Sequence, residues 1–63
     1  MSFKEKRIAA GLTQQNVADA LGIDQGAVSH WERGKNTPRI SILRKLAVLY
    51  HCTVDDLLRE EGG

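Results

Sequence analysis

The sequence predicts an all-α protein, a compact bundle of five short helices around one core. Apolar residues recur at intervals of three and four in successive short segments, and no stretch long enough for a strand alternates apolar with polar residues. Glycine follows each of the first three segments, where helices commonly end in a left-handed residue. With 63 residues, we expect a single domain over residues 1–63 with a small core, because a chain this short buries only about 60% of its unfolded surface.

The first helix is predicted over residues 3–10. Ser2 and Glu5 have the spacing of a capping box, in which each side chain accepts a hydrogen bond from the backbone N–H of the other residue. Three side chains of this helix are expected to face inward: Phe3, Arg7 and Ile8. Glycine at position 11 then ends the helix.

The second and third helices are predicted to form a helix-turn-helix over residues 14–33. Thr13 caps a helix that ends near residue 21, and Asp24 caps a helix that ends near residue 33. Only L-G-I-D separates them, and so short a turn sets two helices at a steep angle. The residues at key positions suit this packing: Ala18 is small where the helices approach, Gly22 allows the turn, and Val28 is an apolar anchor in the second of the two helices.

The fourth and fifth helices follow the loop K-N-T-P, which contains the only proline of the chain. In the fourth helix the apolar residues recur at helical spacing, at Ile40, Leu43, Leu46, Ala47 and Tyr50. His51 stands where glycine is more usual after a helix, so we expect a strained left-handed backbone there. Thr53 caps the last helix, with an apolar side at Val54, Leu57 and Leu58, and the tail at residues 60–63 is expected to fray.

The third helix has an unusual polar face. A helical wheel gathers Gln25, Gly26, Ser29, His30 and Arg33 on one side, opposite Ala27, Val28 and Trp31. A face exposed only to water normally carries Lys and Glu, and glycine costs about 1 kcal/mol of helix propensity relative to alanine. The major groove of DNA accepts such a face, because amides pair with adenine and small residues permit close approach. We therefore predict a recognition helix, with Gln25 as the main base contact.

Charge is unevenly distributed along the chain, although the net charge is only +1. Residues 29–45 contain five basic residues against Glu32 alone, whereas residues 54–63 are acidic. Such clusters are often no more than solvated surface. Beside a recognition helix, however, Arg33, Lys35 and Arg39 are expected to lie over DNA phosphates, and Gln14 with the first amides of its helix is expected to hold another.

Other classes of function find little support in the sequence. The single Cys52 and two scattered His make a poor zinc set, so we expect a core cysteine, no metal and no cofactor. No catalytic set of Ser, His and Asp and no phosphate-binding glycine loop is present, which argues against an enzyme. Without a leader or an apolar run of about 18 residues, the chain is expected to be cytoplasmic, with no contact with a membrane.

The run L-T-Q-Q-N-V-A-D-A-L-G-I-D-Q-G-A-V-S-H-W-E-R-G-K-N-T-P resembles the Cro/C1 (XRE) helix-turn-helix family, which includes the 434 and lambda phage repressors. The resemblance continues through I-L-R-K-L-A and C-T-V-D-D-L-L, so it covers nearly the whole chain. It implies a lambda-repressor-like fold and a sequence-specific regulator of transcription, a repressor, that reads double-stranded DNA through residues 25–33. It also implies a dimer on a two-fold symmetric operator. We expect the homodimer to be weak, formed through the C-terminal third of the chain, and strengthened on DNA with half-sites about 34 Å apart.

The resemblance assigns roles to individual residues. Its base-facing sites match Gln25, Gly26, Ser29 and His30, and its phosphate-contacting sites match Gln14 and Arg33. The other phosphate contacts that we expect are Gln15, Lys35, Asn36 and Arg39. Arg7 and Glu32 match a pair that forms a structural salt bridge between the first and third helices, and Trp31 matches a residue packed behind the reading face.

Two departures from the family pattern stand out, at Gly26, which has no side chain to read a base, and at His51. The chain is expected to be either a small regulator complete in itself or an isolated DNA-binding domain. A protein interaction module, such as the antitoxin of a toxin-antitoxin pair, is the alternative function. Exposed Leu, Phe or Met on the third helix would favour that alternative, and Gln, Ser and His favour DNA.

Overall fold

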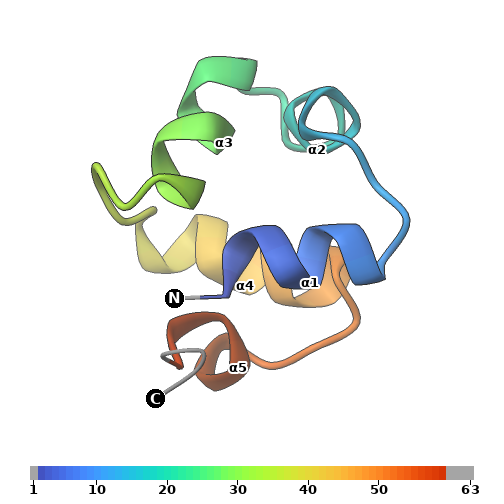
Figure 1. The fold of residues 1–63 in the computed structure, drawn as a ribbon, viewed down its shortest axis with the longest axis vertical. Helices are drawn as coiled ribbons and strands as arrows, with labels where there is room; N and C mark the ends of the chain where they lie inside the picture. Colours follow the sequence, from blue (N-terminus) through green and yellow to red (C-terminus); the bar gives the residue numbers. More distant parts are fainter. Residues whose placement is uncertain (1, 60–63) are drawn as a thin grey trace.

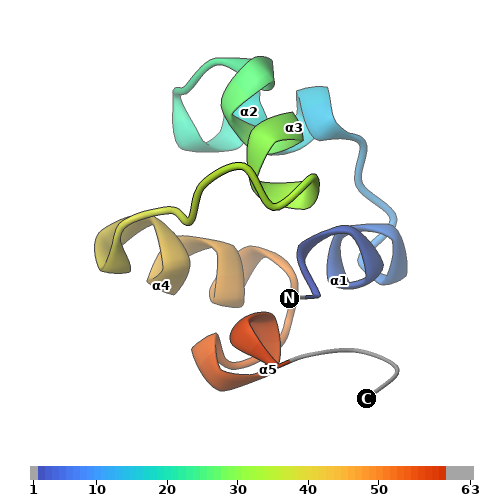
Figure 2. The ribbon, with the colours of Figure 1, turned by 60° about the vertical axis from the view of Figure 1, so that its left-hand side comes forward.

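Five α-helices account for the regular structure in the computed structural model, which describes residues 2–59. They are α1 (Phe3–Ala9), α2 (Gln14–Leu21), α3 (Gln25–Glu32), α4 (Ile40–Leu49) and α5 (Val54–Leu58). Helices α2 and α3 form one end of the molecule, α5 forms the other, and α1 and α4 lie between them (Figures 1 and 2). No strand occurs in residues 2–59, so the predicted all-α bundle of five helices is confirmed.

The core draws on every helix. Its buried apolar residues are Phe3, Val17, Ala18, Val28, Trp31, Leu43, Leu46, Ala47, Tyr50 and Leu57. Cys52 packs against this core and is half-buried, as predicted for a thiol that acts as a small hydrophobe. Among residues 2–59, no helix is long and apolar enough to cross a membrane.

The turn between α2 and α3 has the predicted chemistry. Gly22 adopts a left-handed conformation at φ 68° and ψ 36°, where a side chain would be strained. In this conformation the Gly22 amide donates a hydrogen bond to the Asp19 carbonyl and the Ile23 amide donates to the Ala18 carbonyl, which satisfies the last carbonyls of α2. Ala18 and Val28 are fully buried, so a small residue on α2 and a branched residue on α3 meet the core together.

The other local signals are confirmed at three places. Thr13 and Thr53 each accept a hydrogen bond from the amide three residues later, at 3.0 Å, and each closes a reciprocal capping box, with Asn16 and Asp56 respectively. This capping, with some help from Arg59, lowers the pKa of the Asp56 carboxyl. His51 has φ 56°, the strained left-handed backbone expected after α4.

Several expectations for helix starts and inward faces are wrong. Ser2 makes no capping bond to α1; its hydroxyl donates to the Arg59 carbonyl at 2.9 Å, and its amide donates to the Leu57 carbonyl at 2.9 Å. The carboxylate of Asp24 likewise makes no capping bond to α3. Ile8 and Ile40 keep helical spacing, yet each is 57% exposed. The predicted tail at 60–63 lies outside the described residues.

Tertiary packing explains these errors. The start of α1 meets the end of α5, so Ser2 is fully buried and bonds across the fold. In a chain this small, the core is filled before every apolar side chain can enter it, and the outer turns of α1 and α4 stay exposed. Helix α1 ends at Ala9 and α3 at Glu32, one residue earlier than predicted in each case.

Candidate nucleic-acid interface

Helix α3 presents the predicted polar face to solvent. Gln25 and His30 are exposed, Ser29 and Gly26 are partly exposed, and Trp31 on the opposite side is only 8% exposed. Val28 is fully buried beside Trp31. The helix is therefore anchored by large apolar side chains and leaves short neutral groups facing outward, whose donors and acceptors suit base edges.

Basic and polar side chains surround this face. Arg33 at the end of α3, the loop residues Lys35 and Asn36, and Arg39 before α4 are all exposed. Within residues 2–59 these four side chains make no hydrogen bond or ion pair. Free cations beside a neutral polar face have the arrangement of phosphate contacts around base contacts.

An ion pair between Arg7 and Glu32 braces α3 against α1. The Arg7 Nε lies 2.6 Å from Glu32 Oε2, and Nη2 lies 3.1 Å from Oε1, so the guanidinium grips the carboxylate with two nitrogens. A third nitrogen, Nη1, donates to the Leu12 carbonyl at 2.8 Å. Both side chains are shielded, at 11% and 4% exposed. The hydrogen bond with Glu32 raises the pKa of Arg7, against the opposing effect of burial.

The same carboxylate holds the first glutamine of α2. Gln14 Nε2 donates to Glu32 Oε1 at 3.0 Å, and the Oε1 of Gln14 accepts a hydrogen bond from Gln25 Nε2. An amide flipped the other way could not make both contacts, so Glu32 sets the orientation of Gln14 and Gln14 sets that of Gln25. We call the four side chains Arg7, Glu32, Gln14 and Gln25 the polar relay.

The relay ties two expected DNA contacts together. Gln14 was predicted at a phosphate and Gln25 at a base, and the structure brings the two amides into direct contact. Gln15, the third expected glutamine, donates instead to Asp19 Oδ1 on its own helix at 2.9 Å. Both partners of that bond are exposed, so it is open to exchange with water.

Tyr50, expected on the apolar face of the fourth helix, also lies within the electrostatic influence of Glu32, which the sequence did not predict. Its ring is buried in the core, and burial, with the charge of Glu32 adding to it, raises the pKa of the phenol to about 12. The Gln14–Glu32 bond was also missed. No sequence pattern indicates this hydrogen bond, because its partners lie 18 residues apart.

Gly26 is not required by packing within the domain. Its backbone is helical, and a Cβ placed there would meet only Asp24 Oδ2, at an ordinary contact distance of 3.5 Å. The free protein therefore has room for alanine, which forms helices better. For metals, residues 2–59 contain no group of three or more His, Cys, Asp or Glu that could hold an ion.

The two steeply joined helices and the polar face beyond them define a helix-turn-helix domain. A family model described as helix-turn-helix matches residues 3–57, which is most of the chain. The chain belongs to this family, of the Cro/C1 (XRE) type that its sequence resembles. The family consists of transcriptional regulators and not of enzymes, as the sequence predicts.

Known regulators from bacteria are similar to the chain. The HTH-type transcriptional activator BcrR of Enterococcus faecalis is 35% identical over 97% of this chain and 32% of that protein. The HTH-type transcriptional regulator ImmR of Bacillus subtilis is 38% identical over 94% of this chain and 46% of that protein. An uncharacterized HTH-type transcriptional regulator of the same species, YqaE, is 34% identical over 98% of this chain and 53% of that protein. The chain thus spans about a third to a half of the length of these relatives. No solved structure matches the chain significantly.

Proposed function

We propose that this domain binds double-stranded DNA sequence-specifically through the major groove and thereby regulates transcription. The observation that carries the proposal is the exposed neutral face of α3, with Gln25 oriented by Gln14 and flanked by unpaired cations. Selection of bound duplexes from a random pool tests it directly. Enrichment of a sequence motif is expected, and recovery of unenriched DNA would contradict sequence-specific binding.

Within this proposal the residues divide by role. Gln25, Ser29 and His30 contact base edges, and Gly26 lets the backbone of α3 approach the groove. Arg33, Lys35, Asn36 and Arg39 contact phosphates, with Gln14 and Gln15 at the start of α2. Arg7 and Glu32 touch no DNA and hold the amides of Gln14 and Gln25 in place. The mechanism follows from this division: phosphate contacts set the register, and the preorganised Gln25 amide pairs with one base, adenine being its best partner.

Replacement of Gln25 by alanine is expected to weaken binding to the selected duplex by about 1 to 3 kcal/mol, about 5- to 150-fold, and to relax preference at one base position. Titrations against the selected duplex and its single-base variants measure both effects. Lys35→Ala is the matched control: it should weaken all sequences equally and lower the slope of log K against log salt by about 1. An equal loss on all sequences for Gln25→Ala would contradict base reading.

Replacement of Gly26 by alanine is expected to have opposite effects on folding and on binding. The free domain should gain up to about 1 kcal/mol of stability, because alanine favours helix and the added Cβ meets no tight contact. Affinity for the selected duplex should fall, because the Cβ stands between the backbone and the groove. Urea unfolding and DNA titration of the same variant measure the two changes. Undiminished affinity would show that no close approach occurs at Gly26.

We further propose that the domain binds as a weak homodimer on a two-fold symmetric operator. Symmetric half-sites about 34 Å apart would place two α3 helices in successive major grooves on one side of the duplex. Sedimentation of the domain alone and with a symmetric duplex tests the proposal. Two domains on each duplex and mostly monomer without DNA are expected, whereas a strict one-to-one complex would exclude the dimer.

Repression is the direction of regulation that we propose, since a domain bound across a promoter excludes polymerase without any further contact. In vitro transcription from a promoter that overlaps the selected site should fall as the domain is added. A rise in transcription would instead indicate activation. Activation is the role that the name of the relative BcrR states for that protein. Cytoplasmic location stays a prediction.

A further inference from the structure

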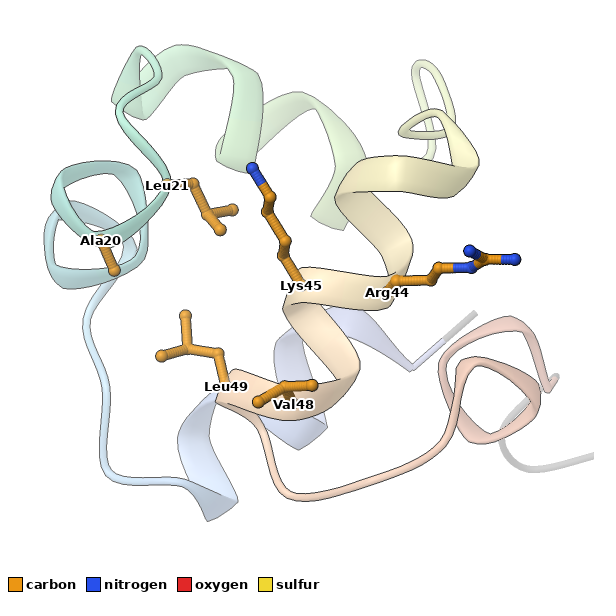
Figure 3. A pocket seen from close by; sticks show the side chains of 6 residues that line it. All are labelled: Ala20, Leu21, Arg44, Lys45, Val48 and Leu49. Carbon is orange, nitrogen blue, oxygen red and sulfur yellow. The ribbon is translucent and has the colours of Figure 1, made fainter.

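A groove of about 420 Å³ lies between α2 and α4, apart from the recognition helix. Its walls are four apolar side chains, Ala20 and Leu21 from α2 and Val48 and Leu49 from α4, with Arg44 and Lys45 along the α4 side. Figure 3 shows the side chains of Leu21 and Leu49 facing each other across the gap, with Lys45 rising beside Leu21 and Arg44 extending away. No residue of the proposed DNA contacts lines the groove.

Apolar side chains that are exposed to solvent line the groove. Val48 is 78% exposed, the most exposed of the large hydrophobic residues in the described part of the chain. Ala20 is also exposed, and Leu21 and Leu49 are partly exposed, so apolar side chains of two separate helices line one groove that is open to solvent. An opening this wide along α4 suits a segment of polypeptide better than an enclosed small ligand.

The charges beside the groove are unpaired. Neither Arg44 nor Lys45 makes an ion pair or a side-chain hydrogen bond within residues 2–59. They precede Val48 and Leu49 by four residues, so each cation lies one helical turn from an apolar wall residue. An occupant that fits must therefore combine an apolar stripe with negative charge along one side.

We propose that this groove binds an acidic amphipathic helix of a partner protein. Laying an apolar helix face into a groove is a common mode of peptide recognition, with residues at i, i+3 and i+7 as anchors. The acidic side of such a helix would meet Arg44 and Lys45. A second copy of this chain fits less well, because Asp55 and Asp56 of its own α5 already share an ion pair with Arg59, at 3.1 Å and 3.6 Å.

Titration of the ¹⁵N-labelled domain with a synthetic helical peptide tests the proposal. The peptide carries leucine at i, i+3 and i+7 and glutamate along one flank. Amide shifts are expected at Leu21, Val48 and Leu49 and not at Gln25 or His30. Val48→Gln and Lys45→Gln should each weaken peptide binding at least tenfold. Ile40→Gln is the matched control, since Ile40 is an exposed apolar residue of the same helix that does not line the groove, and it should leave binding unchanged.

Three results would overturn the proposal. Equal weakening by Ile40→Gln would mean that the peptide binds exposed apolar residues without selection. Equal binding of the same peptide with lysine in place of glutamate would remove the role of the two cations. Shifts at Leu21 and Leu49 that depend on protein concentration without peptide would assign the groove to a second copy. Because no DNA is present, none of these results depends on the proposed DNA binding.

Discussion

Replacement of Glu32 by alanine is expected to destabilise the domain by about 3 to 5 kcal/mol, because it leaves the Arg7 guanidinium buried without its partner. The Arg7 side chain is only 11% exposed and gives two of its three bonds to Glu32. Gln14 loses its acceptor at the same time. Since proteins are stable by about 5 to 15 kcal/mol, with small domains at the low end, most of the variant should unfold at low urea concentrations.

Urea unfolding followed by circular dichroism measures this loss. Arg7→Leu combined with Glu32→Leu is the informative second variant, because removing both charges avoids an unpaired ion and should recover most of the stability. The pair would then matter for the placement of α3 more than for net stability. A loss below about 1 kcal/mol for Glu32→Ala would instead mean that the pair behaves like an exposed surface bridge.

Replacement of Trp31 by alanine is expected to cost about 3 to 5 kcal/mol, the usual loss when a buried aromatic side chain is truncated. Trp31 is 8% exposed and packs on the side of α3 opposite the reading face. Its removal leaves a cavity that the small core, with ten buried apolar residues in the described part of the chain, cannot easily close. Because Trp31 is the only tryptophan of the chain, unfolding of the variant must be followed by circular dichroism and not by fluorescence.

This variant also separates folding from recognition. In conditions where the folded fraction is restored, for example at low temperature, affinity for the selected duplex should still be reduced, since α3 has lost its main support. Trp31→Phe keeps an aromatic ring in the site and should lose less stability and less affinity. If Trp31→Ala bound DNA normally once corrected for its folded fraction, the ring would serve the core alone and not the placement of α3.

Much of the fold follows from signals that act within one helical turn. Thr13 and Thr53 cap helices, Gly22 turns the chain, and His51 takes the left-handed position after α4, each through interactions with residues no more than five positions away. Such signals are readable from sequence because their energies depend little on the rest of the molecule. The wheel of α3 also predicted correctly that Val28 and Trp31 are buried opposite Gln25 and His30.

The errors fall where a distant partner competes with a local one. Ser2 has the spacing of a helix cap, yet its hydroxyl bonds Arg59, 57 residues away, because α5 closes over the start of α1. Ile8 and Ile40 have the spacing of core residues, yet more than half of each residue is exposed to solvent. A periodic pattern reports which face of a helix is apolar, and packing alone settles how much of that face is covered.

The amino-acid sequence was sufficient to predict five helices, the helix-turn-helix and the polar face of α3, because periodicity, caps and turn residues are local properties. The polar relay and the groove between α2 and α4 emerged only in the folded chain. The relay joins residues 11, 18 and 25 positions apart, and the groove is lined by residues of α2 and α4 that are far apart in the sequence. Contacts at such separations are set by how whole helices pack, and no short pattern encodes them.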